Sequence, residues 1–136
     1  MISVSNLSKN YGNVKAVDSI SFELKDGEVV GFLGANGAGK TTTLKMITGY
    51  LVPTNGEIKV NGLDIVNNTS EIQEMIGYLP ELNPLYTEMR VYDYLEFLGS
   101  IRNIKGSDFK QALSRVVDKC GLSGVVHKVI ADCSKG

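Results

Sequence analysis

A glycine-rich segment between an apolar run and a helical pattern constrains this chain most. Residues 29–42 read VVGFLGANGAGKTT, and residues 34–41 match the pattern G-x-x-x-x-G-K-[ST] in full. Glycines in such a loop let successive backbone N–H groups turn toward one point, and the following helix adds the positive end of its dipole. The segment therefore predicts a loop that binds the phosphates of a nucleotide.

The polar residues at the start of the predicted helix have chemical roles in this interpretation. Lys40 supplies a positive charge for the β- and γ-phosphates, and the Thr41 hydroxyl occupies one position on a bridging Mg²⁺ ion. A glycine-rich turn that binds nothing is the alternative, and the coincidence of glycine, lysine and threonine at a strand-to-helix boundary disfavours it. The residues expected to contact the nucleotide here are Gly34, Ala35, Asn36, Gly37, Ala38, Gly39, Lys40, Thr41 and Thr42.

Length and composition predict one soluble domain. The chain has 136 residues, of which 43% are hydrophobic and 21% charged, ordinary values for a globular protein. Its net charge of −1 provides no general attraction to nucleic acid or anionic lipid. No apolar run is long enough to span a bilayer, so we expect a cytoplasmic protein without direct membrane insertion. We expect Cys120 and Cys133 to be reduced thiols and His127 to be an exposed residue.

Alternating apolar residues and short turns predict a strand-rich first part. A helix is expected over residues 40–50, and Asn61-Gly62 is expected to be the two-residue turn of a hairpin. Ser70 and Gln73 have the spacing of a capping box at the start of a short helix. The first three strands, joined by turns at Gly12-Asn13 and Asp26-Gly27, are expected to pair in antiparallel fashion. The expected strands lie at about residues 2–11, 20–24, 28–33, 57–60, 63–65 and 76–79.

The hydrophobic period becomes helical in the last third of the chain. Apolar residues at three- and four-residue spacing predict a helix from Val91 and a second one that is capped by Ser107 and ends at Gly121. Their apolar stripes are expected to pack on each other. Two acidic motifs are rejected as metal or guanine sites, because Asp132 follows an interrupted apolar run and Asp118 lies on a helix.

Four segments, taken in order, resemble the nucleotide-binding subunit of an ABC transporter. They are Tyr11, residues 34–42, residues 77–81 (GYLPE) and residues 134–136 (SKG). The resemblance covers the whole chain and is greatest to exporter-type subunits that pair with separate membrane proteins, including those of drug-efflux and gliding-motility systems. It implies an α/β fold, namely an incomplete RecA-like P-loop NTPase core with an antiparallel β part and an α-helical subdomain.

The resemblance also assigns roles to residues outside the loop. It places Tyr11 against the adenine of ATP with Val17 beside it, although Tyr11 alone could be an ordinary strand aromatic. Glu81 stands where the family usually carries a glutamine that contacts Mg²⁺. A carboxylate can also bind the metal, but its fixed charge disfavours the usual water-positioning role. Lys40 and Glu81 are thus the candidate catalytic residues, and Thr41 and Glu81 the candidate metal ligands.

The family pattern divides the chain into parts. We expect a nucleotide-binding part over 1–80, a linker over 81–90, a helical subdomain over 91–131 and the start of the signature sequence over 132–136. In the family, the acidic strand, the catalytic glutamate and the switch histidine follow that signature. We therefore expect an N-terminal fragment of a longer ATPase subunit, inactive by itself.

The resemblance finally implies partners. The full-length subunit would bind Mg-ATP and hydrolyse ATP in a head-to-tail dimer, held at the inner face of the membrane by a transmembrane permease. Two alternatives stay open: a complete, non-catalytic nucleotide-binding module, and an ABC-type ATPase that acts on nucleic acid or ribosomes. No basic stripe or coiled coil in the sequence supports the second alternative, so no nucleic-acid partner is expected. Candidate contacts to the permease are Tyr86, Met89, Val91 and Tyr92.

Overall fold

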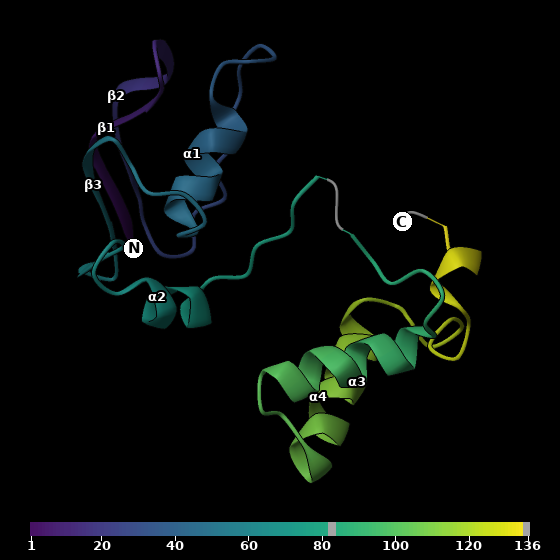
Figure 1. Cartoon of the computed structure of the whole chain (residues 1–136). Helices are drawn as coiled ribbons and strands as arrows, with labels where there is room; N and C mark the ends of the chain where they lie inside the picture. The colour runs from purple at the N-terminus through teal and green to yellow at the C-terminus, as the bar shows by residue number, and fades with distance from the viewer. Residues whose placement is uncertain (82–83, 135–136) are drawn as a thin grey trace. The chain divides into compact units, whose positions relative to one another are not determined.

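The computed structural model describes residues 1–81 and 84–134 and divides into two compact units (Figure 1). The first unit is Met1–Leu79, and the second begins at Pro80. Helices in the described ranges lack the combination of length and hydropathy that a membrane span requires.

A four-stranded antiparallel sheet of order β2-β1-β3-β4 forms the base of the first unit. The first two strands form the predicted hairpin around Gly12 and Asn13, and the last two form the predicted hairpin around Asn61 and Gly62. Asn61 and Gly62 have φ values of 49° and 84°, the left-handed geometry that a two-residue hairpin turn requires. The strands are β1 (Ile2–Tyr11), β2 (Val14–Leu24), β3 (Asn55–Val60) and β4 (Leu63–Asp64).

Helices α1 (Lys40–Ile47) and α2 (Thr69–Met75) complete the core of this unit. Strand residues alternate between core and solvent, and the helices contribute residues at helical spacing to the same cluster. Helix α1 is shorter than the predicted range of 40–50, since Gly49 takes a φ of 73° and ends it. The core consists of Val4, Leu7, Val17, Met46, Ile47, Ile58, Val60, Ile65 and Ile72.

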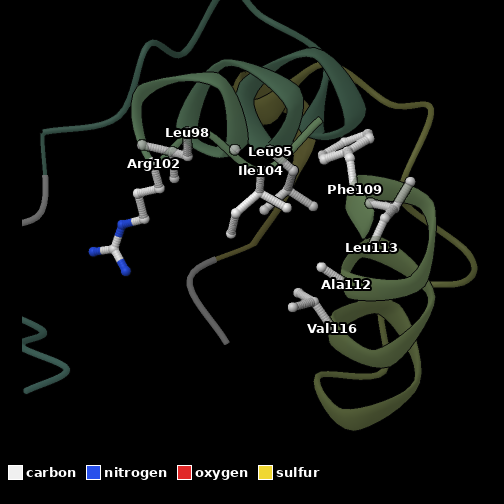
Figure 2. A pocket seen from close by; sticks show the side chains of 9 residues that line it. Leu95, Leu98, Arg102, Ile104, Phe109, Ala112, Leu113 and Val116 are labelled. Carbon is white, nitrogen blue, oxygen red and sulfur yellow. The ribbon is translucent and has the colours of Figure 1, made fainter. Parts of the chain in front are cut away.

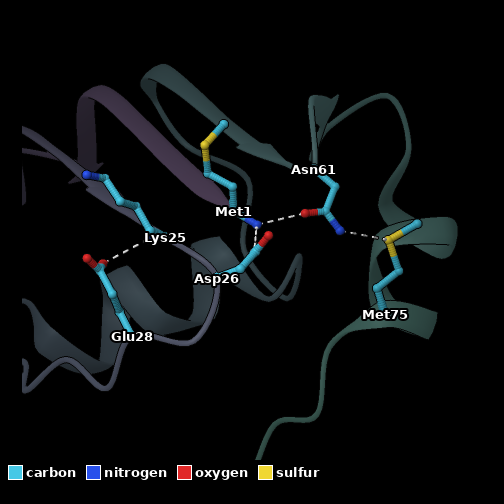
Figure 3. Close-up of polar contacts among 6 residues, drawn as sticks. All are labelled: Met1, Lys25, Asp26, Glu28, Asn61 and Met75. Atoms are coloured by element: carbon cyan, nitrogen blue, oxygen red, sulfur yellow. Dashed lines mark hydrogen bonds and ion pairs between the residues drawn. The ribbon is translucent and has the colours of Figure 1, made fainter.

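Polar contacts fix the turn that follows β2, which was predicted at Asp26-Gly27 (Figure 3). The N-terminal ammonium of Met1 donates to Asp26 and, at 2.8 Å, to Asn61 Oδ1. The Glu28 carboxylate accepts from the Lys25 backbone N–H at 2.9 Å. The start of β1 is thereby tied to the end of β2 and to the β3–β4 turn.

Two predicted strands are absent among the described residues. Residues 28–33 and 76–79 form no regular structure, and Val29, Leu33 and Leu79 are 100%, 94% and 81% exposed. A strand persists only when a neighbouring strand satisfies its backbone N–H and C=O groups. No strand of the described sheet pairs with either segment. The prediction of a third antiparallel strand before the glycine-rich loop is therefore wrong.

Two predicted helix caps are also wrong. Helix α2 begins at Thr69 after Asn68, so Ser70 lies inside the helix and forms no capping box. Gln73 instead donates from Nε2 to the Thr48 carbonyl oxygen beyond α1, at 3.1 Å. In the second unit, Lys105 occupies the N-cap of α4, and Ser107 lies within its first turn.

The second unit contains α3 (Val91–Ile101), α4 (Gly106–Lys119) and the short 3₁₀ helix η1 (Ile130–Asp132). As predicted, α3 and α4 pack on each other: buried Phe109 lies so close to Gly99 that a Cβ there would be 2.9 Å from its ring. An apolar groove of about 320 Å³ runs beside this contact, where the Leu95 and Leu113 side chains approach from the two helices (Figure 2). Asp132 lies in η1 rather than at the end of a strand.

Two minor predictions also hold in the structure. Helix α4 ends at the predicted glycine, because Gly121 has a φ of 64°. His127 is exposed, and its ring stacks on Tyr92 with centroids 6.4 Å apart.

Candidate functional site

Residues 34–39 form a loop that leads directly into α1 and is exposed over residues 34–38. Gly37 and Gly39 have φ values of 83° and 85°, a left-handed conformation that L-residues rarely adopt. The Ala38 N–H donates to the Ala35 carbonyl at 3.1 Å and closes a tight turn within the loop. Gly37 and Gly39 therefore occupy loop positions whose backbone conformation favours glycine.

The Lys40 side chain folds back over the loop that precedes it. Its ammonium Nζ donates to the carbonyl oxygens of Gly34 at 2.7 Å and Ala35 at 2.8 Å. A single positive charge is thus held at the start of the loop, on the same residue that begins α1.

The first backbone N–H groups of α1 have no side-chain cap. The N-cap is Gly39, which has no side chain to accept a hydrogen bond, and the first bond of the helical pattern runs from the Thr43 N–H to the Gly39 carbonyl at 2.8 Å. The N–H groups of Lys40, Thr41 and Thr42 precede that bond and have no carbonyl one turn back to accept them. Together with the helix dipole, these N–H groups have the geometry that suits an anion, and phosphate binding there stays a prediction.

The sheet and helix support the loop through contacts that the sequence reasoning missed. A Cβ at Gly39 would collide with the Ala16 carbonyl oxygen and lie 3.0 Å from Val17 Cγ2, so β2 packs directly on the loop's last glycine. Thr43 is 1% exposed, and its hydroxyl donates to the Gly39 carbonyl at 2.9 Å. The supporting role of Thr43 could have been predicted from its position one helical turn after Gly39. No feature of the neighbouring sequence predicts the contact of Ala16 with the loop.

The two residues expected near the adenine differ in exposure. Tyr11 is 50% exposed and pairs with Val14 at the end of the β1–β2 hairpin. Val17 is 6% exposed, belongs to the core and contacts Gly39. The structure therefore brings Val17 to the loop as a support. Its contact with a nucleotide base stays a prediction.

The expected metal ligands lie in different units. Thr41 is exposed at the start of α1, and Glu81 is exposed in the second unit, so their joint action on Mg²⁺ stays a prediction. Within residues 1–81 and 84–134, no group of three or more His, Cys, Asp and Glu side chains could hold a metal. One hydroxyl beside a loop that is predicted to bind phosphates still suits Mg²⁺, which binds few protein groups and shares phosphate and water oxygens.

The remaining predicted residues belong to the second unit. Tyr86 is 60% exposed, and its ring packs edge-on against Phe97 with centroids 5.7 Å apart. Its role in a permease contact, and those of Met89, Val91 and Tyr92, stay predictions. Ser134 is exposed, and the rest of the expected signature sequence, Lys135 and Gly136, lies outside the described residues.

Comparison with known proteins relates this site to a family. Residues 17–136 match the family model described as ABC transporter. The chain is 38% identical over 135 residues to an uncharacterised ABC transporter ATP-binding protein of Methanocaldococcus jannaschii. The alignment covers 99% of this chain and 47% of that protein. It is 35% identical to the bacitracin transport ATP-binding protein of Bacillus licheniformis, over 100% of this chain and 44% of the relative. The chain thus spans about half the length of these relatives.

Solved structures agree with the sequence comparison. An ATP-binding subunit of an ABC transporter superposes with a TM-score of 0.81 at 27% identity, over 98% of this chain and 56% of that one. A component of an ABC transporter complex from Clostridium perfringens superposes with a TM-score of 0.82 at 27% identity, over 98% of this chain and 55% of that one. The predicted α/β P-loop NTPase fold is therefore confirmed, and the chain belongs to the ABC transporter family, with the fold of its ATP-binding domain.

Proposed function

We propose that this chain binds Mg-ATP as the nucleotide-binding part of an ABC transporter ATPase subunit. The observation that carries the proposal is the geometry at the start of α1, where a glycine N-cap leaves three backbone N–H groups without a cap and the Lys40 ammonium is held on the carbonyls of the preceding loop. Such a site favours an anion with several oxygens, because each N–H and the ammonium can donate to a different oxygen.

Each residue of the site has a part in this proposal. Lys40 exchanges its bonds to the loop carbonyls for bonds to the β- and γ-phosphates, and the loop N–H groups hold the remaining phosphate oxygens. Thr41 offers its hydroxyl to Mg²⁺, with Glu81 as a further oxygen ligand. When bound, Mg²⁺ would supply positive charge against the negative charge that develops on the phosphates. Tyr11 stacks on the base.

Family membership supports a wider proposal for the whole protein. We infer that the subunit hydrolyses ATP to drive export through a transmembrane permease, working as a head-to-tail dimer peripheral to the inner face of the membrane. The names of relatives support this inference. Among them are a bacitracin transport ATP-binding protein and a probable multidrug ABC transporter ATP-binding protein of Escherichia coli, which is 34% identical over 125 residues.

Titration calorimetry with Mg-ATP tests the binding site directly. Replacing Lys40 with alanine removes charge-assisted hydrogen bonds of about 1.5–3 kcal/mol, so we expect affinity to fall about 10- to 100-fold. The matched control is Lys45→Ala, because Lys45 lies on the same helix in its last turn, where we place no ligand. Equal affinity of Lys40→Ala and the unmodified chain would contradict the proposal.

The metal role of Thr41 requires a separate measurement. ATP affinity is compared with and without Mg²⁺ in the unmodified chain and in Thr41→Val, which keeps the shape but removes the hydroxyl. We expect the valine variant to lose most of the gain that Mg²⁺ gives while it retains metal-free binding. A full Mg²⁺ effect in Thr41→Val would exclude the hydroxyl as a ligand.

A further inference from the structure

We propose that Lys9 is a positioning residue that fixes Tyr11 for stacking on the nucleotide base, an inference that rests on the proposed function. The Lys9 ammonium lies over the Tyr11 ring, 5.5 Å from its centroid. This distance is within the range of a cation–π attraction, in which a positive charge is drawn to the negative face of an aromatic ring.

The ammonium is itself held in place by a hydrogen bond. Lys9 Nζ donates at 2.7 Å to the carbonyl oxygen of Val52, in the segment that follows α1. That segment is tied to β1 by two further bonds, from the Thr54 N–H to the Ser8 carbonyl at 2.9 Å and from the Asn10 N–H to Thr54 Oγ1 at 3.0 Å. The charge over the ring is therefore anchored to a fixed acceptor rather than free in solvent.

The position of this pair relative to the phosphate loop supports the inference. Lys9 is the partner of Val17 in the β1–β2 register, and the next residue back along β2 is Ala16, which with Val17 packs on Gly39. The same hairpin thus carries the Lys9–Tyr11 pair at its end and supports the phosphate loop along its length.

The physical effect follows from the two faces of the ring. Tyr11 is half exposed, and Lys9 occupies one face, which leaves the other for a flat ligand. A base that stacks on a ring already held in one orientation does not pay for ordering it. Lys9 should therefore strengthen binding of ligands that contain a base and have no effect on ligands that contain phosphates alone.

The experiment measures two ligands on the full 136-residue chain: Mg-ATP, and Mg-tripolyphosphate, which has no base. We expect Lys9→Met to weaken ATP binding about two- to five-fold, the size of an exposed cation–π contact, and to leave tripolyphosphate binding unchanged. Lys9→Arg keeps a cation over the ring and should restore ATP affinity. The matched control is Lys15→Met, which removes an exposed lysine of the same hairpin that pairs with Asp18.

A double-mutant cycle separates positioning from a general effect on the fold. In a Tyr11→Leu background, Lys9→Met should cause no further loss of ATP affinity, because the ring that it positions is gone. Equal losses for both ligands, or an undiminished loss in the Tyr11→Leu background, would overturn the proposal. Failure of the proposed function gives a different result, namely tripolyphosphate binding that Lys40→Ala does not weaken.

Discussion

Two apolar segments of the first unit are both predicted to be strands, but only one of them forms a strand in the structure. β3 pairs with β1 and β4, and its residues Ile58 and Val60 are 0% and 4% exposed. Residues 28–33 are at least as apolar, yet they form no strand, and Val29 is fully exposed. An apolar pattern therefore gives a segment only a tendency to form a strand, and the presence of a neighbouring strand decides whether the strand forms.

The largest expected effect contrasts these two segments directly. Ile58→Ala opens a cavity in the core and should lower the free energy of unfolding by about 2–5 kcal/mol. Val29→Ala removes an exposed side chain and should change it by less than about 0.5 kcal/mol. Urea unfolding followed by circular dichroism measures both. Comparable losses of unfolding free energy in the two variants would show that residues 28–33 are buried in solution, which would contradict the difference between the two segments.

A second pair of variants tests how far β2 supports the loop that follows the unpaired segment. Gly39→Ala forces a Cβ into the Ala16 carbonyl at a left-handed φ, whereas Gly37→Ala meets no atom within 4 Å at a similar φ. We expect a loss of about 1–3 kcal/mol for Gly39→Ala, the larger of the two, with weaker ATP binding. The same unfolding curves and calorimetry apply. Equal losses at the two glycines would mean that only φ matters and that contact with β2 does not.

The third pair compares a turn of the paired sheet with the unpaired segment 76–79. Gly62 has a φ of 84° and Gly77 has no positive φ, and a Cβ would meet no atom within 4 Å at either position. Gly62→Ala should therefore cost about 1–2 kcal/mol from the left-handed conformation alone. Gly77→Ala should be neutral or slightly stabilising, because it restricts the unfolded chain. Thermal unfolding of both variants checks this, and destabilisation by Gly77→Ala would indicate a defined structure there.

Sequence reasoning succeeded where the determinants are local. The phosphate loop, both hairpin turns and the end of α4 depend on glycines and their immediate neighbours, so the sequence predicts them. It failed where the determinants are distant in the chain. The contact of Ala16 with Gly39, the anchoring of Lys9 on Val52 and the missing partners of residues 28–33 all depend on tertiary neighbours. Their residue types carry no local signal of these roles.

The smallest expected effect concerns a residue whose predicted partner was wrong. Gln73 has the spacing of a capping-box residue with Ser70, but its side chain bonds to the Thr48 carbonyl of another segment at 3.1 Å. Gln73→Ala should therefore lower the free energy of unfolding by about 0.5–1.5 kcal/mol, the net value of one hydrogen bond. Ser70→Ala should change it little, because Ser70 is exposed inside the helix. If Ser70→Ala costs as much as Gln73→Ala and the two losses are not additive, the local capping box exists after all. If only Gln73→Ala has an effect, the tertiary contact with Thr48 has replaced the local capping box.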